Sequence, residues 1–405
     1  MRLFIVLLLL PVFGYAQRNV RGTLIDSDTN LPISFATIYI SGSTIGTSAD
    51  SNGFFLLRSV PSFKTTLVVS AMGYEVFSKT LEAGEHGLEL GDIRLNMRPE
   101  MLEEVSISPH SNFVREQRMK EFLDEFIGKT PNSKKTKLLN PEFVHTFLDM
   151  STLKMSAKAD RTLVFKNDAL GYLINVDLEL FEGSATQGYE IQGHYFFIPL
   201  SDNKAKVKQY EKARKEAYVH SFKRFLHQVF APKPEWDAFE IFAFKHLQNQ
   251  EKNRVSTLIS AQEKEYLALG GGTRGDFQKY LQNYYHKDSI AYFAKVLEQA
   301  SYFLEVDTIA TSLLELVQKD GEIAYFIREG NYGVRFTKRQ KNQKLPQFSK
   351  EHNLDAAMIL RQNHIMLNSH GIFYPPLSIT FGGVWSWNGR LADMLAQDYT
   401  PDTSN

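Results

Sequence analysis

Short hydrophobic runs alternate with turn-forming segments from residue 18 to about residue 97. The turn segments, DSDTNLP, SGSTIG, ADSNG and EAGEHG, are rich in Asp, Asn, Ser and Gly. Short strands at this spacing, separated by such turns, predict a β-sandwich. The predicted strands are Val20–Ile25, Phe35–Ile40, Phe54–Leu57, Thr66–Ser70, Glu75–Leu81 and Asp92–Leu95.

The stretch TSADSNGFFLL, Thr47 to Leu57, places turn-forming residues directly before an apolar run. The side chains of Asp50 and Asn52 can hydrogen-bond to nearby backbone, and Gly53 can adopt the positive φ that a tight turn needs. An EF-hand-like calcium loop would require a bidentate Glu at the position that Ser59 occupies, and only one carboxylate would be present. The pattern therefore predicts a turn between two strands.

A charged segment follows the predicted sandwich. Asn112–Ile127 is predicted to be helical, and the polar stretch TPNSKKTK indicates a domain boundary at about residue 137. Beyond it, Tyr172–Leu180 alternates apolar and polar residues, which predicts a half-buried strand. Tyr189–Leu200 is expected to pair with that strand. Lys204–Phe230 is predicted to be one helix with an apolar stripe on its second half.

The rest of the chain adds strands and a few helices. We therefore expect an all-β sandwich over residues 17–97, a linker with a helix over 98–137, and an α+β domain with a mostly antiparallel sheet over 138–405. Predicted strands are Glu240–Phe244, Tyr302–Thr308, Ile323–Ile327 and Tyr332–Thr337, and predicted helices are Asp276–Tyr285, Ala356–Arg361 and Gly389–Leu395.

Composition narrows the classes of function. Lys plus Arg and Asp plus Glu both number 46, so no overall field favours nucleic acid or another polyanion. Hydrophobic residues make up 43% of the chain, which is enough for packed cores. The sequence has no cysteine, which excludes disulfides and thiolate metal sites.

The first 16 residues resemble a secretory signal. Arg2 supplies a positive charge, Leu3–Leu10 is an unbroken apolar run, and small residues precede a predicted cleavage site before Gln17. We therefore expect an exported protein of the periplasm or one associated with the outer membrane.

The segments GTLIDSDTNLPISFATIYI, SGSTIGTSADSNGFFLL and VVSAMGYE together resemble the carboxypeptidase regulatory-like domain. That resemblance implies a prealbumin-like β-sandwich, a module common in exported proteins of Gram-negative bacteria that is not itself the peptidase. The following MLEEVSIS, Met101 to Ser108, resembles the segment that leaves this module in outer-membrane receptors. The whole chain resembles uncharacterised exported proteins that carry the domain, which implies no particular activity.

A zinc peptidase site is the catalytic possibility that this resemblance invites. His86 and Glu89 have the spacing of a metallocarboxypeptidase ligand pair, with His194 as a conceivable third ligand, but the pair lies inside the predicted sandwich. His220 and His227 are about 10 Å apart on one helix, too far to share an ion, and are predicted to be exposed. We predict no metal site.

Nucleotide binding and nucleophilic catalysis also lack complete motifs. The stretch GGGTRG, Gly270 to Gly275, has the glycine spacing of a dinucleotide loop but follows a helix-like segment, AQEKEYLAL, rather than a strand. No G-x-S-x-G is present. We predict no catalytic residue, no cofactor and no nucleotide ligand.

Two surfaces remain as candidates for binding. Lys204–Arg224 holds eight basic and two acidic residues, for which a solvated helix face is the preferred interpretation. Late in the chain Tyr374, Trp385 and Trp387 form an aromatic group. The two tryptophans would share one face if that segment were extended. We predict these three aromatic residues as the possible binding surface.

The leading hypothesis is an exported, non-enzymatic interaction or scaffold protein of the cell envelope. Its partner would be a cell-envelope protein or polymer, with no nucleic acid and at most peripheral membrane association. One alternative is a hydrolase of peptides or glycans with a site in residues 138–405. Another is a small outer-membrane barrel, which the alternation in Tyr172–Leu180 suggests.

Overall fold

The computed structural model describes residues 17–84, 87–98, 109–149, 152, 154–184, 188–231, 238–270, 274–321, 323–337, 352–368, 371–375 and 377–401. The predicted signal at residues 1–16, His86 and the MLEEVSIS segment lie outside these described residues. The chain divides into two compact units. Unit 1 comprises Met1–Pro232, Leu367–Phe373 and Val384–Asn405, and unit 2 comprises Lys233–Met366 and Tyr374–Gly383.

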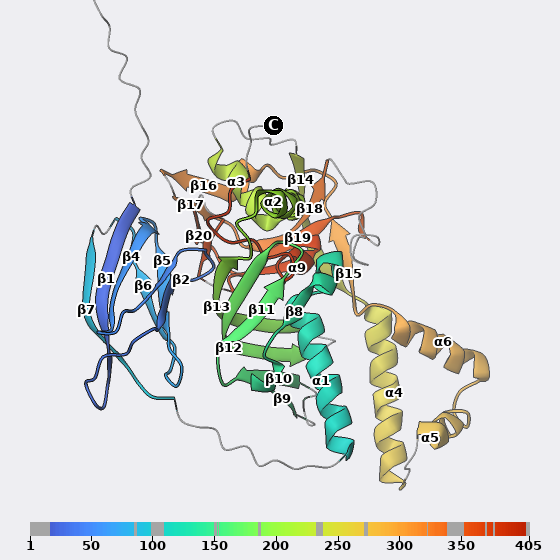
Figure 1. Ribbon diagram of the computed structural model, residues 1–405. Helices are drawn as coiled ribbons and strands as arrows, with labels where there is room; N and C mark the ends of the chain where they lie inside the picture. The colour runs from blue at the N-terminus through green and yellow to red at the C-terminus, as the bar shows by residue number, and fades with distance from the viewer. Residues whose placement is uncertain are drawn as a thin grey trace, which may run out of the picture. The chain divides into compact units, whose positions relative to one another are not determined.

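Unit 1 begins with a β-sandwich of two sheets (Figure 1). In the first sheet, β1 is central and pairs antiparallel with β4 and parallel with β7. The order in the second sheet is β3-β2-β5-β6. The strands are β1 (Gln17–Asp26), β2 (Thr37–Ile40), β3 (Gly46–Ser48), β4 (Phe54–Pro61), β5 (Thr65–Ser70), β6 (Phe77–Leu81) and β7 (Leu88–Leu95).

Side chains from both sheets form the sandwich core, because alternate residues of each strand point inward. Val20, Leu24, Ile38, Leu67 and Val69 are fully buried in it. The predicted sandwich is confirmed, and each predicted strand is present. The short strand β3 was not predicted, since its residues, GTS, carry no apolar side chain.

The remainder of unit 1 is built on a six-stranded sheet of order β8-β11-β12-β10-β9, with β13 also pairing with β12. The strands of this sheet pair antiparallel with one another, and the predicted hairpin of β12 with β13 is confirmed. The strands are β8 (Thr136–Leu138), β9 (Val144–Asp149), β10 (Lys154–Ala159), β11 (Leu163–Asn167), β12 (Tyr172–Ser184) and β13 (Gly188–Pro199), with short 3-10 helices at Pro131–Lys135 and Pro141–Phe143.

Helix α1 (Pro109–Ile127) packs on one face of this sheet. Phe122 and Phe126 of α1 contact Phe165 and Phe181 of the sheet, with ring centroids 4.9–5.3 Å apart. Residues near the C-terminus complete the same core, since Leu391, Ala392 and Ala396 are buried in it. The apolar positions of β12 point toward this core, so its polar positions point to the opposite face of the sheet.

The segment predicted as one helix, Lys204–Phe230, is two helices, α2 (Lys204–Val219) and α3 (Phe222–Phe230). The break lies at Ser221, whose hydroxyl accepts a hydrogen bond from the Arg224 N–H and caps α3. His220, just before the break, is buried rather than exposed as predicted. The periodicity of apolar residues does not detect such a cap, because the stripe continues across it.

Unit 2 contains a five-stranded antiparallel sheet of order β15-β14-β18-β19-β22. The segment Ala356–Arg361, predicted to be a helix, is instead strand β19, because a short apolar run has no period that separates strand from helix. The strands are β14 (Phe239–Gln248), β15 (Tyr302–Val306), β18 (Gly330–Phe336), β19 (Ala356–Leu360) and β22 (Ile379–Gly383), with a hairpin of β16 (Val317–Asp320) and β17 (Ile323–Phe326) after helix α7 (Leu313–Leu316).

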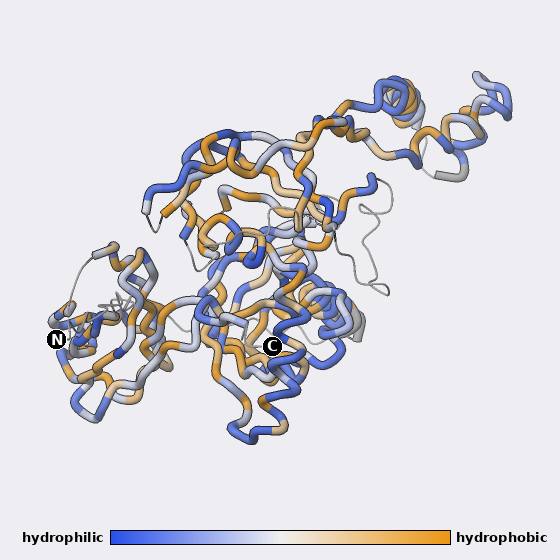
Figure 2. The backbone as a smooth tube through the Cα atoms, turned by 90° about the horizontal axis from the view of Figure 1, so that it is seen from above, coloured by the Kyte–Doolittle hydropathy of each residue, from blue (hydrophilic) through white to orange (hydrophobic). Residues whose placement is uncertain are grey.

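Between β14 and β15 the chain forms three helices, which stand apart from the sheet of the same unit in both views (Figure 1, Figure 2). They are α4 (Gln250–Ala268), α5 (Arg274–Leu281) and α6 (Lys287–Glu298). Val255, Phe293 and Val296 form their own small core. Strands β20 (Ile365–Asn368) and β21 (Phe373–Tyr374) carry the chain between the two units, and α9 (Val384–Asn388) begins the last segment of unit 1.

Among the residues that the structure describes, no helix is both long enough and apolar enough to cross a membrane.

The aromatic core between α1 and the sheet gives a direct test of the fold. Replacing the fully buried Phe165 by Ala is expected to lower the free energy of unfolding by about 3–5 kcal/mol, because it removes burial and leaves a cavity. The matched control is Phe147→Ala on β9, where the ring is 45% exposed. Chemical denaturation should show at most a small change for the control. Equal losses in both variants would contradict this core assignment.

Candidate functional site: the anchored sandwich and its apolar end

A buried carboxylate joins the sandwich to the rest of unit 1. Asp177, on the polar face of β12, accepts hydrogen bonds from the hydroxyls of Tyr39 (2.6 Å), Ser70 (3.1 Å) and Thr162 (2.6 Å). Tyr39 and Ser70 belong to the sandwich, whereas Thr162 and Asp177 do not. Tyr39 and Asp177 are almost fully buried. Burial, reinforced by the Asp177 charge, raises the pKa of Tyr39, which keeps its phenol a hydrogen-bond donor.

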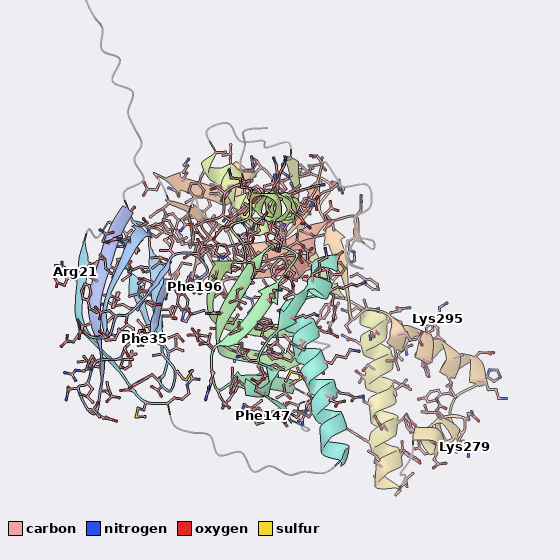
Figure 3. All side chains as sticks on the ribbon, in the orientation of Figure 1. Arg21, Phe35, Phe147, Phe196, Lys279 and Lys295 are labelled. Carbon is pink, nitrogen blue, oxygen red and sulfur yellow. The ribbon has the colours of Figure 1, made fainter. Side chains whose placement is uncertain are left out.

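The loop after β2 extends the contact through backbone hydrogen bonds. The N–H of Gly42 donates to the Tyr195 carbonyl at 2.6 Å, and the N–H of Phe197 donates to the Ser43 carbonyl at 3.0 Å. The Phe196 ring stacks on Tyr39 with centroids 5.1 Å apart, and it lies between the sandwich and β13 (Figure 3).

Close approach at this contact requires a glycine at the first residue of β3. A Cβ at Gly46 would lie 2.3 Å from the Phe196 ring, so any other residue would collide with it.

The C-terminal segment holds the same loop from another side. Gln397 donates its N–H to the Gly42 carbonyl at 2.7 Å, and Thr44 donates to the Asp398 carboxylate. Lys223 fixes this segment, because its Nζ donates to the carbonyls of Ala396, Gln397 and Tyr399 at 2.6–2.9 Å.

Burial lowers the pKa of Lys223 to about 7, and the nearby Asp398 partly opposes the shift. Lys223 belongs to the basic segment that was predicted to be a solvated helix face. Its ammonium group instead forms hydrogen bonds within unit 1. Arg214 does so too, since its guanidinium donates to the carbonyls of Leu170 and Gly171.

His194, the conceivable zinc ligand, takes part in the sandwich contact. Its Nδ1 is hydrogen-bonded to Ser41 Oγ at 3.1 Å, and its Nε2 lies 3.1 Å from Glu179 Oε1. Hydrogen bonding to His194 lowers the pKa of Glu179. Within the described part of the chain, no group of three or more His, Asp or Glu residues is placed to hold a metal ion. His86 lies outside that part.

In contrast to the buried polar contact at Asp177, an exposed apolar surface lies at one end of the sandwich. Strands β1 and β7 finish there, and β2 and β4 begin there, as their registers show. Four separate connections each bring apolar side chains to this end. We call it the apolar end, and its residues are Leu31 (64% exposed), Phe35 (78%), Phe54 (44%), Met72 (80%) and Met97 (61%).

The connections at the apolar end are tied together by Asp26. Its Oδ1 accepts hydrogen bonds from the Thr29 N–H (2.7 Å), the Thr29 hydroxyl (2.9 Å) and the Asp28 N–H (3.0 Å). Its Oδ2 accepts from the Tyr74 hydroxyl at 2.9 Å, which links the β1–β2 loop to the β5–β6 loop. These donors, with the Thr29 N–H foremost, lower the pKa of Asp26 to about 2.

The turn predicted from TSADSNGFFLL is confirmed at the same end. Asp50 Oδ1 accepts from the N–H groups of Asn52 (2.8 Å) and Phe54 (3.0 Å). Gly53 has φ +74°, and a Cβ there would lie 2.4 Å from the Leu24 carbonyl oxygen. The turn therefore places Phe54 firmly at the apolar end.

Phe35 has both a strained backbone conformation and an exposed apolar ring. Its φ is +59°, a region that bulky residues rarely occupy and that costs about 1–3 kcal/mol. Its ring is also among the most exposed apolar side chains described. Its N–H donates to the Ala49 carbonyl, which fixes the conformation from within the sandwich. Strain combined with exposure makes Phe35 a candidate contact residue.

The predicted aromatic surface is dispersed in the structure. Trp385 is 1% exposed and packs against Phe222 and Phe225 at centroid distances of 5.1 and 5.0 Å. Its segment is helix α9, not an extended strand, so Trp385 and Trp387 do not share a face. Trp387 and Tyr374 are half-buried, and Tyr374 belongs to unit 2. Ligand binding by these residues stays a prediction.

The residues of the apolar end were not predicted as a site. Phe35 and Phe54 begin predicted strands, the other three stand in turns or beyond the last strand, and only the fold brings them together. The one signal in the sequence was that large apolar residues stand inside turn segments, as Leu31 does in DSDTNLP.

Comparison with protein families identifies the first module. Residues 20–107 match the CarboxypepD_reg-like domain. The sandwich is a CarboxypepD_reg-like domain. The resemblance read from the sequence is thereby confirmed for this part of the chain, and the domain is of a regulatory, non-catalytic kind. No curated protein matches the chain.

Solved structures resemble parts of the chain at low identity. A Coh3ScaB-XDoc_M2ScaA cohesin–dockerin complex from Acetivibrio cellulolyticus is 20% identical, with 19% of this chain and 56% of that chain covered and a TM-score of 0.18. The shaft pilin SpaA from Lactobacillus rhamnosus GG is 12% identical, with 22% and 48% covered and a TM-score of 0.17.

A putative membrane-associated protein of unknown function from Bacteroides fragilis is 9% identical, with 78% and 87% covered and a TM-score of 0.17. The chain covers about half the length of the cohesin–dockerin structure and of the pilin structure. At such TM-scores the similarities support no functional conclusion.

The Tyr39–Asp177 hydrogen bond is expected to hold the CarboxypepD_reg-like domain in place. Tyr39→Phe removes one of the three donors to a buried carboxylate and should destabilise unit 1 by about 1–3 kcal/mol. Amide hydrogen exchange at Gly42 should accelerate in this variant. The control is Tyr302→Phe, at an exposed position of β15. Unchanged exchange at Gly42 would argue against this anchoring role.

The Asp26 network predicts a pH dependence of stability. The folded-state pKa of Asp26 is about 2, below its ordinary 3.8, so its stabilisation is full above about pH 4 and is lost as the pH falls through 2. Asp26→Asn should therefore lower the melting temperature at pH 6 and flatten its fall between pH 4 and pH 2. Asp28→Asn, an exposed neighbour, is the control. A variant with the wild-type pH profile would refute the network's contribution.

Proposed function

We propose that this protein is an exported, non-enzymatic interaction protein of the cell envelope. In this proposal its CarboxypepD_reg-like domain is a binding module that the remainder of unit 1 holds in a fixed orientation. The apolar end is the surface that meets a partner. The observation that carries the proposal is the group of five exposed apolar side chains on connections fixed by Asp26 and Asp50.

Two further features support a binding role. First, buried polar and exposed apolar residues are separated within one domain. The hydrogen bonds of Tyr39 and Ser70 with Asp177 are largely buried, whereas the apolar side chains of the apolar end are exposed. Second, the strain at Phe35 persists although an exposed ring adds little to folding, which is expected of a residue kept for contact.

The envelope location rests on the predicted signal of residues 1–16 and on the frequent occurrence of this kind of domain in exported proteins. If the signal is processed as predicted, the protein recovered from fractionated cells will begin at Gln17. N-terminal sequencing of the periplasmic and membrane fractions tests this directly. Recovery of the protein from the cytoplasm with Met1 retained would overturn the proposed location.

The contact role can be tested by photo-crosslinking in cells. A benzoylphenylalanine placed at Phe35 is expected to give a discrete adduct with an envelope component, because the position is exposed and outward. The same probe at Phe303, 51% exposed on β15 of unit 2, is the control. Absence of an adduct at position 35, or the same adduct from both positions, would contradict the proposal.

A further inference from the structure

We propose that the apolar end inserts into the surface of a zwitterionic phospholipid bilayer, one rich in phosphatidylethanolamine. This inference rests on the proposed function and names the partner of the same surface. It is carried by three features of the apolar end: the kind of surface it offers, the charges around it, and its rigidity.

The apolar end offers side chains rather than backbone. The N–H groups of Asp28, Thr29, Phe35, Asn52 and Phe54 all donate to acceptors within the sandwich. A peptide that added to the sandwich as a strand would need such donors, whereas lipid acyl chains accept no hydrogen bonds. The apolar residues also stand on separate connections at the ends of strands, which suits a soft phase that conforms to projecting side chains.

The charges around the apolar end are nearly balanced. Asp28, Asp50 and Glu75 are exposed there. Two arginines lie nearby and keep their positive charges, because Arg94 donates to the neutral Asn30 side chain and Arg98 to the Asp160 carbonyl. The apolar end therefore has no excess of positive charge that would draw it to an anionic bilayer surface. Its carboxylates complement the ammonium groups of phosphatidylethanolamine and its arginines the phosphates, so the charge pattern favours a zwitterionic surface.

The connections that carry the apolar residues are fixed before any contact. The Tyr74 hydroxyl ties the Met72 loop to Asp26. The Arg98 N–H donates to the Gly73 carbonyl, and the Glu75 N–H to Asn96, which ties the Met97 segment to the same loop. Little conformational entropy is therefore lost when these side chains enter the interface, to a depth of about 5–10 Å.

The experiment uses the protein without residues 1–16 and vesicles of phosphatidylethanolamine and phosphatidylcholine. We expect co-sedimentation with these vesicles that changes little between low and high salt. Phe35→Ser/Met72→Ser should weaken partitioning about tenfold or more, since two of the most exposed apolar side chains are lost. A Phe35→Trp variant should show a blue-shifted emission on binding.

The matched control is Phe303→Ser/Ile309→Ser in unit 2, which removes a Phe and an aliphatic side chain of 51% and 81% exposure. It should partition like the wild type. Circular dichroism and thermal melts of both double variants establish that the fold is kept. Lys208→Glu on α2 tests the alternative route through the basic helix, and it should leave partitioning unchanged.

Several results would overturn the inference. These are no binding to the zwitterionic vesicles, binding only to anionic vesicles with loss at high salt, and equal losses in the two double variants. Self-association that Phe35→Ser/Met72→Ser abolishes, without vesicle binding, would assign the surface to a second copy instead. A protein adduct from the position-35 crosslinker, without vesicle binding, would show that the lipid inference is wrong. The proposed function would still be supported in that case.

Discussion

The Asp177 carboxylate is the group on which the arrangement of unit 1 depends. A buried carboxylate is costly unless hydrogen bonds satisfy it, and here three hydroxyls do so, two of them from the sandwich. Because Tyr39 and Ser70 can reach Asp177 only when the sandwich is in contact with β12, the carboxylate favours one orientation over sliding alternatives. Apolar contact alone, such as Phe196 on Tyr39, would specify that orientation less sharply.

A second carboxylate, Asp26, has the corresponding role at the apolar end of the domain. It accepts hydrogen bonds from two loops and fixes them relative to each other. An aspartate thus stabilises both the buried contact between the sandwich and β12 and the exposed apolar end. In both cases hydroxyl and N–H donors satisfy the carboxylate.

The fold could be predicted from sequence wherever local chemistry was decisive. The Asp50–Gly53 turn and the β12–β13 hairpin are of this kind, because turn residues and alternation act over a few positions. Strand β19 could not be distinguished from a helix, since its environment on both sides in the sheet is what makes it a strand.

The candidate site was less accessible to sequence reasoning. The alternation in β12 identified Asp177 and Glu179 as polar positions, but alternation cannot distinguish a face toward water from a face toward a second module. Trp385 illustrates the converse difficulty, because an aromatic residue is as suited to a core as to a surface, and Trp385 is buried. The apolar end joins residues more than sixty positions apart, so only the folded chain reveals it.

The clamp of the C-terminal segment on the Gly42 loop has a consequence for the order of assembly. During synthesis the sandwich strands appear before the segments that anchor them, and they can form their own core first. The hydrogen bonds to Asp177 become possible once β12 has been made, whereas the hydrogen bond from Gln397 to Gly42 and the contacts of Lys223 with residues 396–399 must wait for more than 200 further residues. The sandwich is therefore oriented in two stages, first by the carboxylate and later by the clamp.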